Sequence, residues 1–216
     1  RMLVLESSPP MSFRDADGRL FIAGLPVRGE GSGDSSWILA QRQIRVVGAT
    51  LIWDDEQRRA PQLVMQEVNI AVDNDGRRHR FALAAQAPEA LASRIDVRGD
   101  FRGRTFEHLA DWQGQAFAEL GYIDLEAWRP WVDYPLDLSR GHGAFRAWLS
   151  LEHGEIRGAT ADLALDEVDA RLDHTLPALR LDTLNGRLQA AFSSDGTTVA
   201  GRGVSVLARA GEGSSD

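Results

Sequence analysis

The sequence predicts a mainly β protein: a curved antiparallel sheet, or β-groove, of two related β units with a small helical insert. The first supporting observation is a pattern that occurs twice. Residues 61–72 align without a gap on residues 177–188 as P-x-L-x-[ML]-x-x-[VL]-N-x-x-[VL]. In both copies the apolar residues alternate, slip once at the same place, and alternate again, as a β-bulge causes in a strand. The second observation is that alternation recurs along most of the chain, which is typical of a sheet with one dry and one solvated face.

Composition and charge narrow the class of partner. The chain has 216 residues, a formal net charge of −8 and no cysteine. An acidic protein repels nucleic acid and anionic membrane surfaces, so we expect neutral or apolar partners. The lack of cysteine excludes disulfides, cysteine-bound zinc and a thiol nucleophile. The chain begins at Arg1 and has no signal-like run and no apolar stretch of the roughly 18 residues that a span needs. We therefore expect a segment of a longer protein.

Residues 1–36 are expected to form N-terminal strands and a loop rich in glycine and serine. Met2 to Leu5 and Leu20 to Ala23 are short apolar runs separated by turn residues, which is typical of two strands. Residues 28–36 (RGEGSGDSS) predict a linker or mobile loop. A cap within residues 34–36 would then begin a short helix from Trp37 to Gln41.

Residues 37–104 are the first predicted β unit. A strand is expected from Gln43 to Trp53, followed by the first copy of the repeated pattern. Asp75-Gly76 then predicts a tight hairpin turn into a strand from His79 to Ala85. The clearest strand runs from Arg94 to Arg102, with Ile, Val, Gly and Phe on one face and alternating Arg and Asp on the other. Charges of mixed sign belong on a solvated surface, so the opposite face is the one to be covered.

Residues 105–140 are predicted to be a helical insert, because the β rhythm breaks there. Helices are expected over Thr105 to Trp112 and over Asp124 to Val132, with a further strand between them from Gln115 to Tyr122. Asp124 is the expected N-cap of the second helix, which Pro130 shortens to a turn or two.

Residues 141–208 are the second predicted β unit, and residues 209–216 a disordered tail. Alternation returns from Phe145 to Glu152, and His153-Gly154 predicts the turn into a strand from Ala159 to Asp166. The second copy of the pattern follows, and then a last strand from Thr198 to Ala208.

The acidic clusters are interpreted as turns and solvated surface. Asp73-Asn74-Asp75-Gly76 resembles the start of a calcium loop, but Ala84 stands at the twelfth position, where such a loop requires glutamate. The remaining acidic groups are of the kind that glycosidases pair: Asp54, Asp55 and Glu56, and Asp162 with Asp166. Each lies in a predicted turn or on the solvent side of a strand, so we expect solvated roles.

The sequence predicts no catalytic residue, no metal ligand and no cofactor. The five histidines lack the H-x-H or H-x-x-x-H spacing of metal sites; they are His79, His108, His142, His153 and His174. Trp148 is expected on the polar side of its strand beside Arg146, stacked under an arginine or under the helical insert. The alternative is that Trp148 contacts another part of the parent chain.

The apolar faces of the two units are the best functional candidate. From the first unit they comprise Leu63, Met65, Val68, Ile70, Val72, Phe81, Leu83, Ile95, Val97 and Phe101, and from the second Phe145, Leu149, Leu151, Leu163, Leu165, Leu179, Leu181, Leu184 and Leu188. If the two faces close on each other, they form the core of a β-sandwich. If the sheet curls without closing, the same residues line a trough suited to acyl chains. Alternation alone does not distinguish these outcomes.

The order of several short motifs resembles the YhdP branch of the AsmA-like proteins, relatives of TamB. The resemblance runs from about Trp37 to Val206. It is carried by residues 37–41 (WILAQ), 49–56 (ATLIWDDE), 60–63 (APQL), 91–92 (LA), 97–101 (VRGDF), 124–128 (DLEAW), 143–149 (GAFRAWL), 159–165 (ATADLAL) and 176–179 (LPAL).

This resemblance implies a segment of a large periplasmic protein whose parent chain is anchored in the bacterial inner membrane. Repeated β units would form a long groove that lets phospholipid move toward the outer membrane without an enzymatic step, supporting outer-membrane lipid homeostasis. The expected partners are phospholipid acyl chains and the remaining repeats of the parent chain, with membrane contact only through other parts of that chain. The alternative is a closed β-sandwich that acts as a structural or protein-interaction module of an envelope scaffold.

Overall fold

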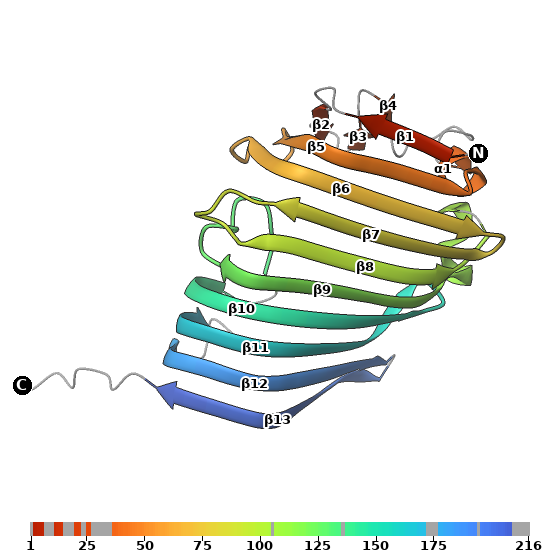
Figure 1. The fold of residues 1–216 in the computed structure, drawn as a ribbon. Helices are drawn as coiled ribbons and strands as arrows, with labels where there is room; N and C mark the ends of the chain where they lie inside the picture. The colour runs from red at the N-terminus through yellow and green to blue at the C-terminus, as the bar shows by residue number, and fades with distance from the viewer. Residues whose placement is uncertain are drawn as a thin grey trace, which may run out of the picture.

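The strands form one 13-stranded sheet in the computed structural model (Figure 1). The structure describes residues 2–6, 11–14, 20–22, 25–26, 36–104, 106–134, 137–171, 177–193 and 195–208. The predicted fold class is confirmed, because nine antiparallel strands lie in one open, curved sheet and almost none of the chain is helical. These strands are β5 (Gln43–Asp55), β6 (Leu63–Asp75), β7 (Arg78–Gln86), β8 (Arg94–Arg102), β9 (Gln113–Asp124), β10 (Asp137–Glu152), β11 (Glu155–Arg171), β12 (Leu179–Ser193) and β13 (Gly196–Ala208).

From β5 to β13 each strand pairs with the next one in sequence, so the chain winds back and forth across the sheet (Figure 1). The two predicted units are therefore not separated: β9 pairs with β8 on one side and with β10 on the other. Among the described residues no second sheet lies against this one. The closed sandwich that the sequence left open is not the architecture of this part of the chain.

The slip in the repeated pattern is a pair of β-bulges, as predicted. In β6 the register with β7 shifts between Gln66 and Asn69, and Glu67 takes a positive φ of 49°. In β12 the register with β13 shifts between Leu181 and Thr183. Each bulge moves the following apolar residues back to the face that the preceding ones occupy. This explains why the apolar residues change from odd to even numbers along the strand.

The predicted hairpin turns are also confirmed. Asp75 pairs with Arg78 around Gly76, whose φ of 59° suits glycine. Glu152 pairs with Glu155 around His153 and Gly154, which have φ values of 53° and 75°. Two consecutive residues with positive φ match the right-handed twist of the flanking strands.

The N-terminal strands lie along β5. They are β1 (Met2–Glu6) and β2 (Met11–Arg14), both parallel to β5, with β3 (Leu20–Ile22) and β4 (Leu25–Pro26) continuing from β2. The expected short helix is α1 (Ser36–Ala40). None of the described helices is long and apolar enough to cross a membrane. Residues 28–35 of the loop predicted at 28–36, and the tail at 209–216, lie outside the described residues, and Ser36 begins α1.

The helical insert expected at residues 105–140 is mostly not helical. Its centre is the long strand β9, and its first part is the short 3-10 helix η1 (Phe106–Asp111). Beyond β9, Asp124 caps a single helical turn by accepting a hydrogen bond from the Ala127 N–H at 2.9 Å. Pro130 has no N–H to continue the helix, so residues 125–131 remain a series of turns.

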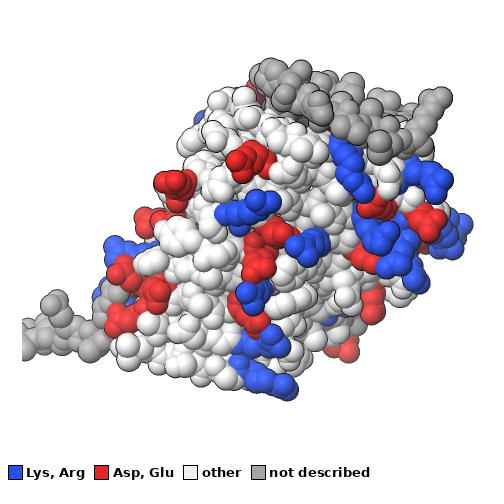
Figure 2. Space-filling model, in the orientation of Figure 1, with Lys and Arg blue, Asp and Glu red and all other residues white. Residues whose placement is uncertain are grey.

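One face of the sheet carries ion pairs between neighbouring strands, and we call it the polar face. The closest N–O distances are 2.7 Å for Arg45–Asp73, 2.5 Å for Arg78–Asp100, 2.7 Å for Arg146–Glu119 and 2.5 Å for Arg187–Asp162. Figure 2 shows basic and acidic side chains interspersed on the side turned to the viewer. The charged, solvated face that the sequence predicts is therefore formed.

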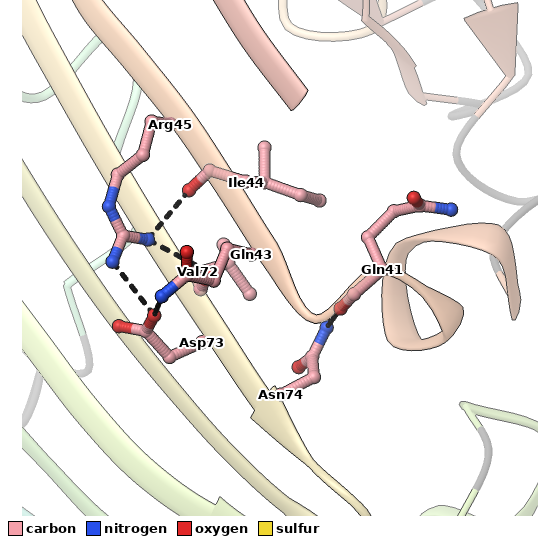
Figure 3. A network of polar contacts seen from close by, with 7 residues as sticks. All are labelled: Gln41, Gln43, Ile44, Arg45, Val72, Asp73 and Asn74. Atoms are coloured by element: carbon pink, nitrogen blue, oxygen red, sulfur yellow. Dashed lines mark hydrogen bonds and ion pairs between the residues drawn. The ribbon is translucent and has the colours of Figure 1, made fainter. Parts of the chain in front are cut away.

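The contacts of Arg45 show how these pairs hold two strands in register (Figure 3). Its Nη2 donates to Asp73 Oδ1 at 2.7 Å, and its Nη1 donates to the carbonyls of Ile44 and Val72, both at 3.0 Å. Nearby, Asn74 Nδ2 donates to the Gln41 carbonyl at 2.6 Å and so attaches the segment after α1 to the end of β6.

Candidate functional site

The opposite face of the sheet, from β5 to β13, is apolar, and we call it the apolar face. The strand registers bring all nineteen residues of the sequence prediction to this one face. For example, Ile70 pairs with Leu83, Leu83 with Val97, and Phe145 with Leu163. The two halves meet at β9, where Leu120 pairs with Ile95 on one side and Phe145 on the other. The two predicted faces are thus one continuous surface.

Most of this surface is only half-covered. Of the nineteen side chains, Leu63, Val68, Leu165 and Leu181 are buried, Leu149 and Leu179 are exposed, and the other thirteen are intermediate. Leu181 is 2% exposed, whereas Leu179, two residues earlier on the same strand, is 43% exposed. A facing protein layer would bury such residues more evenly, as it does in a sandwich core. The apolar face is therefore a partly open surface.

Buried clusters lie toward the end of the sheet where β6, β10 and β12 begin. One contains Ala49, Val68 and Ala85, a second contains Ala92, Leu120 and Ile123 with Ala87, and a third contains Leu138, Val168 and Leu181 with Leu165 and Ala170. Leu125 packs against both the second and the third. These clusters anchor one long side of the apolar face.

Residues 125–134 cover this side, and we call them the strap. Trp128 Nε1 donates to the Leu91 carbonyl at 3.0 Å, and Trp131 Nε1 donates to the Pro61 carbonyl at 3.0 Å. Arg58 Nη1 donates to Asp133 Oδ1 at 2.8 Å. The strap thus links the connection after β9 to the turn between β5 and β6, across the intervening strands.

Tyr134 fastens the far end of the strap. Its hydroxyl donates to the Leu125 carbonyl at 2.9 Å, and its ring packs against the third cluster. Burial raises the pKa of this hydroxyl, with the nearby Asp124 charge acting in the same direction. The group therefore stays protonated and keeps donating.

The opposite side of the apolar face is closed locally by a buried polar group. His79 Nδ1 lies 2.8 Å from Asn74 Oδ1, and its Nε2 lies 3.3 Å from the Gly103 carbonyl. The imidazole stacks on Trp112 with the ring centres 5.3 Å apart. Gly103 is required because a Cβ there would lie 2.3 Å from the Trp112 ring. His79 has a structural role here, since its ring is buried and held between Asn74, Gly103 and Trp112.

The middle of the apolar face has a floor of small residues that the site prediction missed. Ala116 and Ala118 on β9 pair with Leu149 and Ala147 on β10, and Ala147 in turn pairs with Ala161 on β11. These alanines are partly exposed. They share the alternation of Phe145 and Leu163, so parity could have identified them. Restricting the prediction to large apolar residues left them out.

Few ionisable groups reach the apolar face. Among the described residues of β5 to β13, the strand registers place Asp55 and His79 there, at opposite ends of their strands, and both are buried. Asp55 Oδ1 accepts the Arg58 N–H at 3.0 Å. The stretch between the two ends is apolar on every strand.

The two groups of carboxylates that the sequence analysis compared with glycosidase pairs lie far apart in the sheet. Asp162 accepts two hydrogen bonds from Arg187, at 2.5 and 2.7 Å, and this contact lowers its pKa. Asp162 and Asp166 lie four residues apart on β11, roughly 13 Å along the strand. Asp54 and Asp55 belong to β5, separated from β11 by five strands. The solvated role expected for Asp55 is wrong: this residue is only 1% exposed, because β5 continues as far as Asp55 and places its side chain on the apolar face. No cluster of three or more His, Asp or Glu side chains suited to a metal ion occurs in the described part of the chain. His174 lies outside the described residues.

Trp148 lies on the polar face, as expected, and contacts an arginine. The arginine is Arg187, whose Cζ lies 5.6 Å from the centre of the indole ring. Arg146, the predicted neighbour, pairs with Glu119 instead. Phe117 on β9 packs beside Trp148 with ring centres 5.3 Å apart.

Comparison with protein families gives one informative result. The family model described as YhdP protein matches residues 8–212, which is nearly the whole chain. No curated protein and no solved structure matches. The match covers every strand from β5 to β13, so the family assignment applies to the apolar face as a whole.

Proposed function

The chain belongs to the YhdP family, an AsmA-like family of the bacterial envelope, and on that premise we propose that its apolar face conducts phospholipid acyl chains. The protein would be one segment of a periplasmic bridge between the inner and outer membranes. Transport would be passive, without a catalytic step or a cofactor. The parent protein would be anchored in the inner membrane by parts outside this segment.

The observation that supports this proposal best is the continuous, half-exposed apolar surface from β5 to β13. Its middle carries Leu83, Val97, Ala118 and Ala147 on successive strands, and these side chains are partly exposed. A surface of this kind is unfavourable in water unless something apolar covers it. An acyl chain would gain about 0.8 kcal/mol for each methylene that it buries there.

The same surface favours movement rather than fixed binding. Neighbouring strands are about 4.8 Å apart, so an acyl chain lying across them meets a similar apolar row at each step. The alanines in the middle leave room for the chain, and no charged side chain of the described strands β5 to β13 interrupts its path between the strand ends. A nearly uniform surface keeps the barrier between successive positions low. The head group would remain in solvent at the uncovered side.

Strand β13 offers a way to extend the surface. Among the described residues β13 pairs only with β12, along one of its sides, and all its described residues are exposed. Val199 and Val206 continue the apolar face there and are 67% and 50% exposed. An unpaired strand edge is a template for another strand. We expect the next repeat of the parent chain to pair with β13 and carry the apolar face onward.

The proposal is tested by native mass spectrometry of the protein purified from bacterial lysate in a mild detergent-free buffer. We expect peaks heavier than the bare chain by the mass of one or more phospholipids, which organic extraction then removes. Protein that consistently shows only its bare mass, including after incubation with phospholipid vesicles, would contradict the conduit. The scaffold function would then be preferred for this segment.

A further inference from the structure

The polar face contains an elongated hollow near the end of the sheet where β10 and β12 terminate. Its first part has a volume of about 430 Å³ and reaches from β9 to β13 around Trp148. Its second part, of about 400 Å³, continues toward β7 and shares Gln115 and Ser150 with the first. Volumes of this size are typical of sites for small molecules, which run from roughly 300 to 1,000 Å³. We call the two parts together the Trp148 hollow.

Strand register explains why the surface is hollow here. Ser150 pairs with Gly158, and Gly158 with Ala191, so three small residues lie side by side on adjacent strands. In the next row Trp148 pairs with Thr160, and Thr160 with Gln189. The small side chains of Ser150, Gly158 and Ala191 therefore leave a depression beside the large side chain of Trp148. The Trp148 side chain is held by Phe117 and Arg187 but is still 37% exposed.

The polar groups around the first part of the hollow are neutral. The amides of Gln115 and Gln189 and the hydroxyls of Thr160 and Thr198 have no hydrogen-bond partner among the contacts of the described residues. The charges of the nearby Arg187 and Asp162 offset each other, because these two side chains form a bidentate ion pair. The hollow thus offers one partly exposed aromatic ring and several neutral donors and acceptors that have no partner among the described residues.

From this combination we propose that the Trp148 hollow binds an oligosaccharide. A sugar ring has an apolar side of C–H groups that packs on an aromatic ring, and a rim of hydroxyls that both donate and accept hydrogen bonds. Trp148 supplies the first contact, and Gln115, Thr160 and Gln189 supply the second. Nucleic acid finds no excess of positive charge here.

The shape of the hollow favours several linked rings rather than a single sugar. The second part runs from Ser150 and Glu152 on β10 across Gln115 on β9 to the Arg78–Asp100 ion pair, which joins β7 and β8. A chain that stacks one ring on Trp148 can extend along this path on the same face. Affinity should therefore rise with the number of rings. The hollow is on the face opposite to the lipid surface, so the two sites are separate.

The test measures binding of N-acetylglucosamine and glucose oligomers, from two to six rings, by isothermal titration calorimetry. We expect at least one series to bind with an affinity that rises with length. Trp148→Ala should weaken binding at least tenfold. Thr198→Trp, on the exposed strand β13, should do the same by filling the hollow without touching the core. Ala147→Asp, on the apolar face, should leave sugar binding unchanged.

Failure of every oligomer to bind, or binding that survives both Trp148→Ala and Thr198→Trp, would overturn the proposal. Circular dichroism verifies that each variant is folded. If Trp148→Ala is unfolded, Thr198→Trp decides alone, because its side chain replaces an exposed threonine. Lipid binding by the wild-type protein is measured in the same samples, so a negative result for sugar is distinguishable from a negative result for lipid.

Discussion

A matched pair of substitutions on β10 tests the role of the apolar face. Ala147 is on that face between Ala118 and Ala161, whereas Ala144 is on the polar face of the same strand, paired with Ala164. Both side chains are half-exposed. Replacing each alanine by aspartate introduces the same charge into the same strand. Only Ala147→Asp brings it to the proposed lipid surface.

The expected magnitude follows from the spacing of the strands. An acyl chain crossing one strand covers about 4.8 Å, which corresponds to roughly four methylenes. A hydrated carboxylate at Ala147 would lift these methylenes off the sheet. At about 0.8 kcal/mol each, the loss is about 3 kcal/mol, or on the order of a hundredfold in affinity. Ala144→Asp should have an effect of less than about threefold, since solvent screens its charge on the polar face.

The assay is displacement of a fluorescent phospholipid from the lipid-free protein, with circular dichroism to verify folding. The reasoning is refuted if both variants bind lipid as well as the wild type, or if both lose affinity equally while remaining folded. Either result would show that lipid, if bound, does not lie along the middle of the apolar face.

Three further predictions concern stability, and each is measured as the free energy of unfolding in urea. Leu181→Ala should lower the free energy of unfolding by about 2–5 kcal/mol because Leu181 is 2% exposed. Leu179→Ala, on the same face of β12, should lower it by less than about 1 kcal/mol. Equal losses in the two variants would contradict the partly open surface. Gly143→Ala should lower the free energy of unfolding by more than about 1 kcal/mol, because Gly143 has a φ of 147° and a Cβ there would lie 2.1 Å from the Ala164 carbonyl oxygen. Gly121→Ala should be tolerated, because its Cβ would lie 3.4 Å from Ser93 Oγ. Hydrogen bonding to Arg45 and Arg78 lowers the pKa of Asp73 and Asp100. Their contribution to stability is therefore present above the unfolded aspartate pKa of about 3.9 and is lost as the pH falls through the lowered folded values. Stability should fall below about pH 4, and less steeply in Asp100→Asn; an unchanged slope in that variant would argue against the ion pair.

Much of the sheet was predictable because alternation reports which face a residue occupies. The slip of parity after Met65 and after Leu181 is visible in the sequence, since a bulge must restore the apolar residues to one face. Arg94 to Arg102 shows both faces at once, and its predicted bounds are those of β8. The same alternation located the nineteen apolar residues, because it requires no knowledge of which strands pair.

Contacts between distant parts of the chain were not predictable in this way. The strap depends on Trp131 reaching Pro61 and on Arg58 reaching Asp133, which are 70 and 75 residues apart. Alternation within one segment carries no information about such pairs. For the same reason the sequence predicts that Trp148 stacks on an arginine or on the insert without identifying the arginine, which is Arg187 on β12, two strands away in the sheet.

The shape of the sheet also depends on more than one segment. The apolar pattern is compatible with two facing sheets or with one open sheet. What distinguishes them is that β9 pairs with both β8 and β10 and so joins the halves edge to edge. The breaks in alternation on either side of Gln113–Asp124 favoured an insert, although the strand itself was visible between them.

Photo-crosslinking in living bacteria tests most directly whether an acyl chain occupies the apolar face. A photoreactive amino acid is placed in the full-length protein at Leu83, Val97, Leu149 or Leu163 on the apolar face, with Arg98 and Ala164 on the polar face as controls. The account predicts that the first four positions label phospholipid and the controls do not. Labelling of protein alone at Leu83, Val97, Leu149 and Leu163 would show that another protein layer covers this face, and would contradict the conduit.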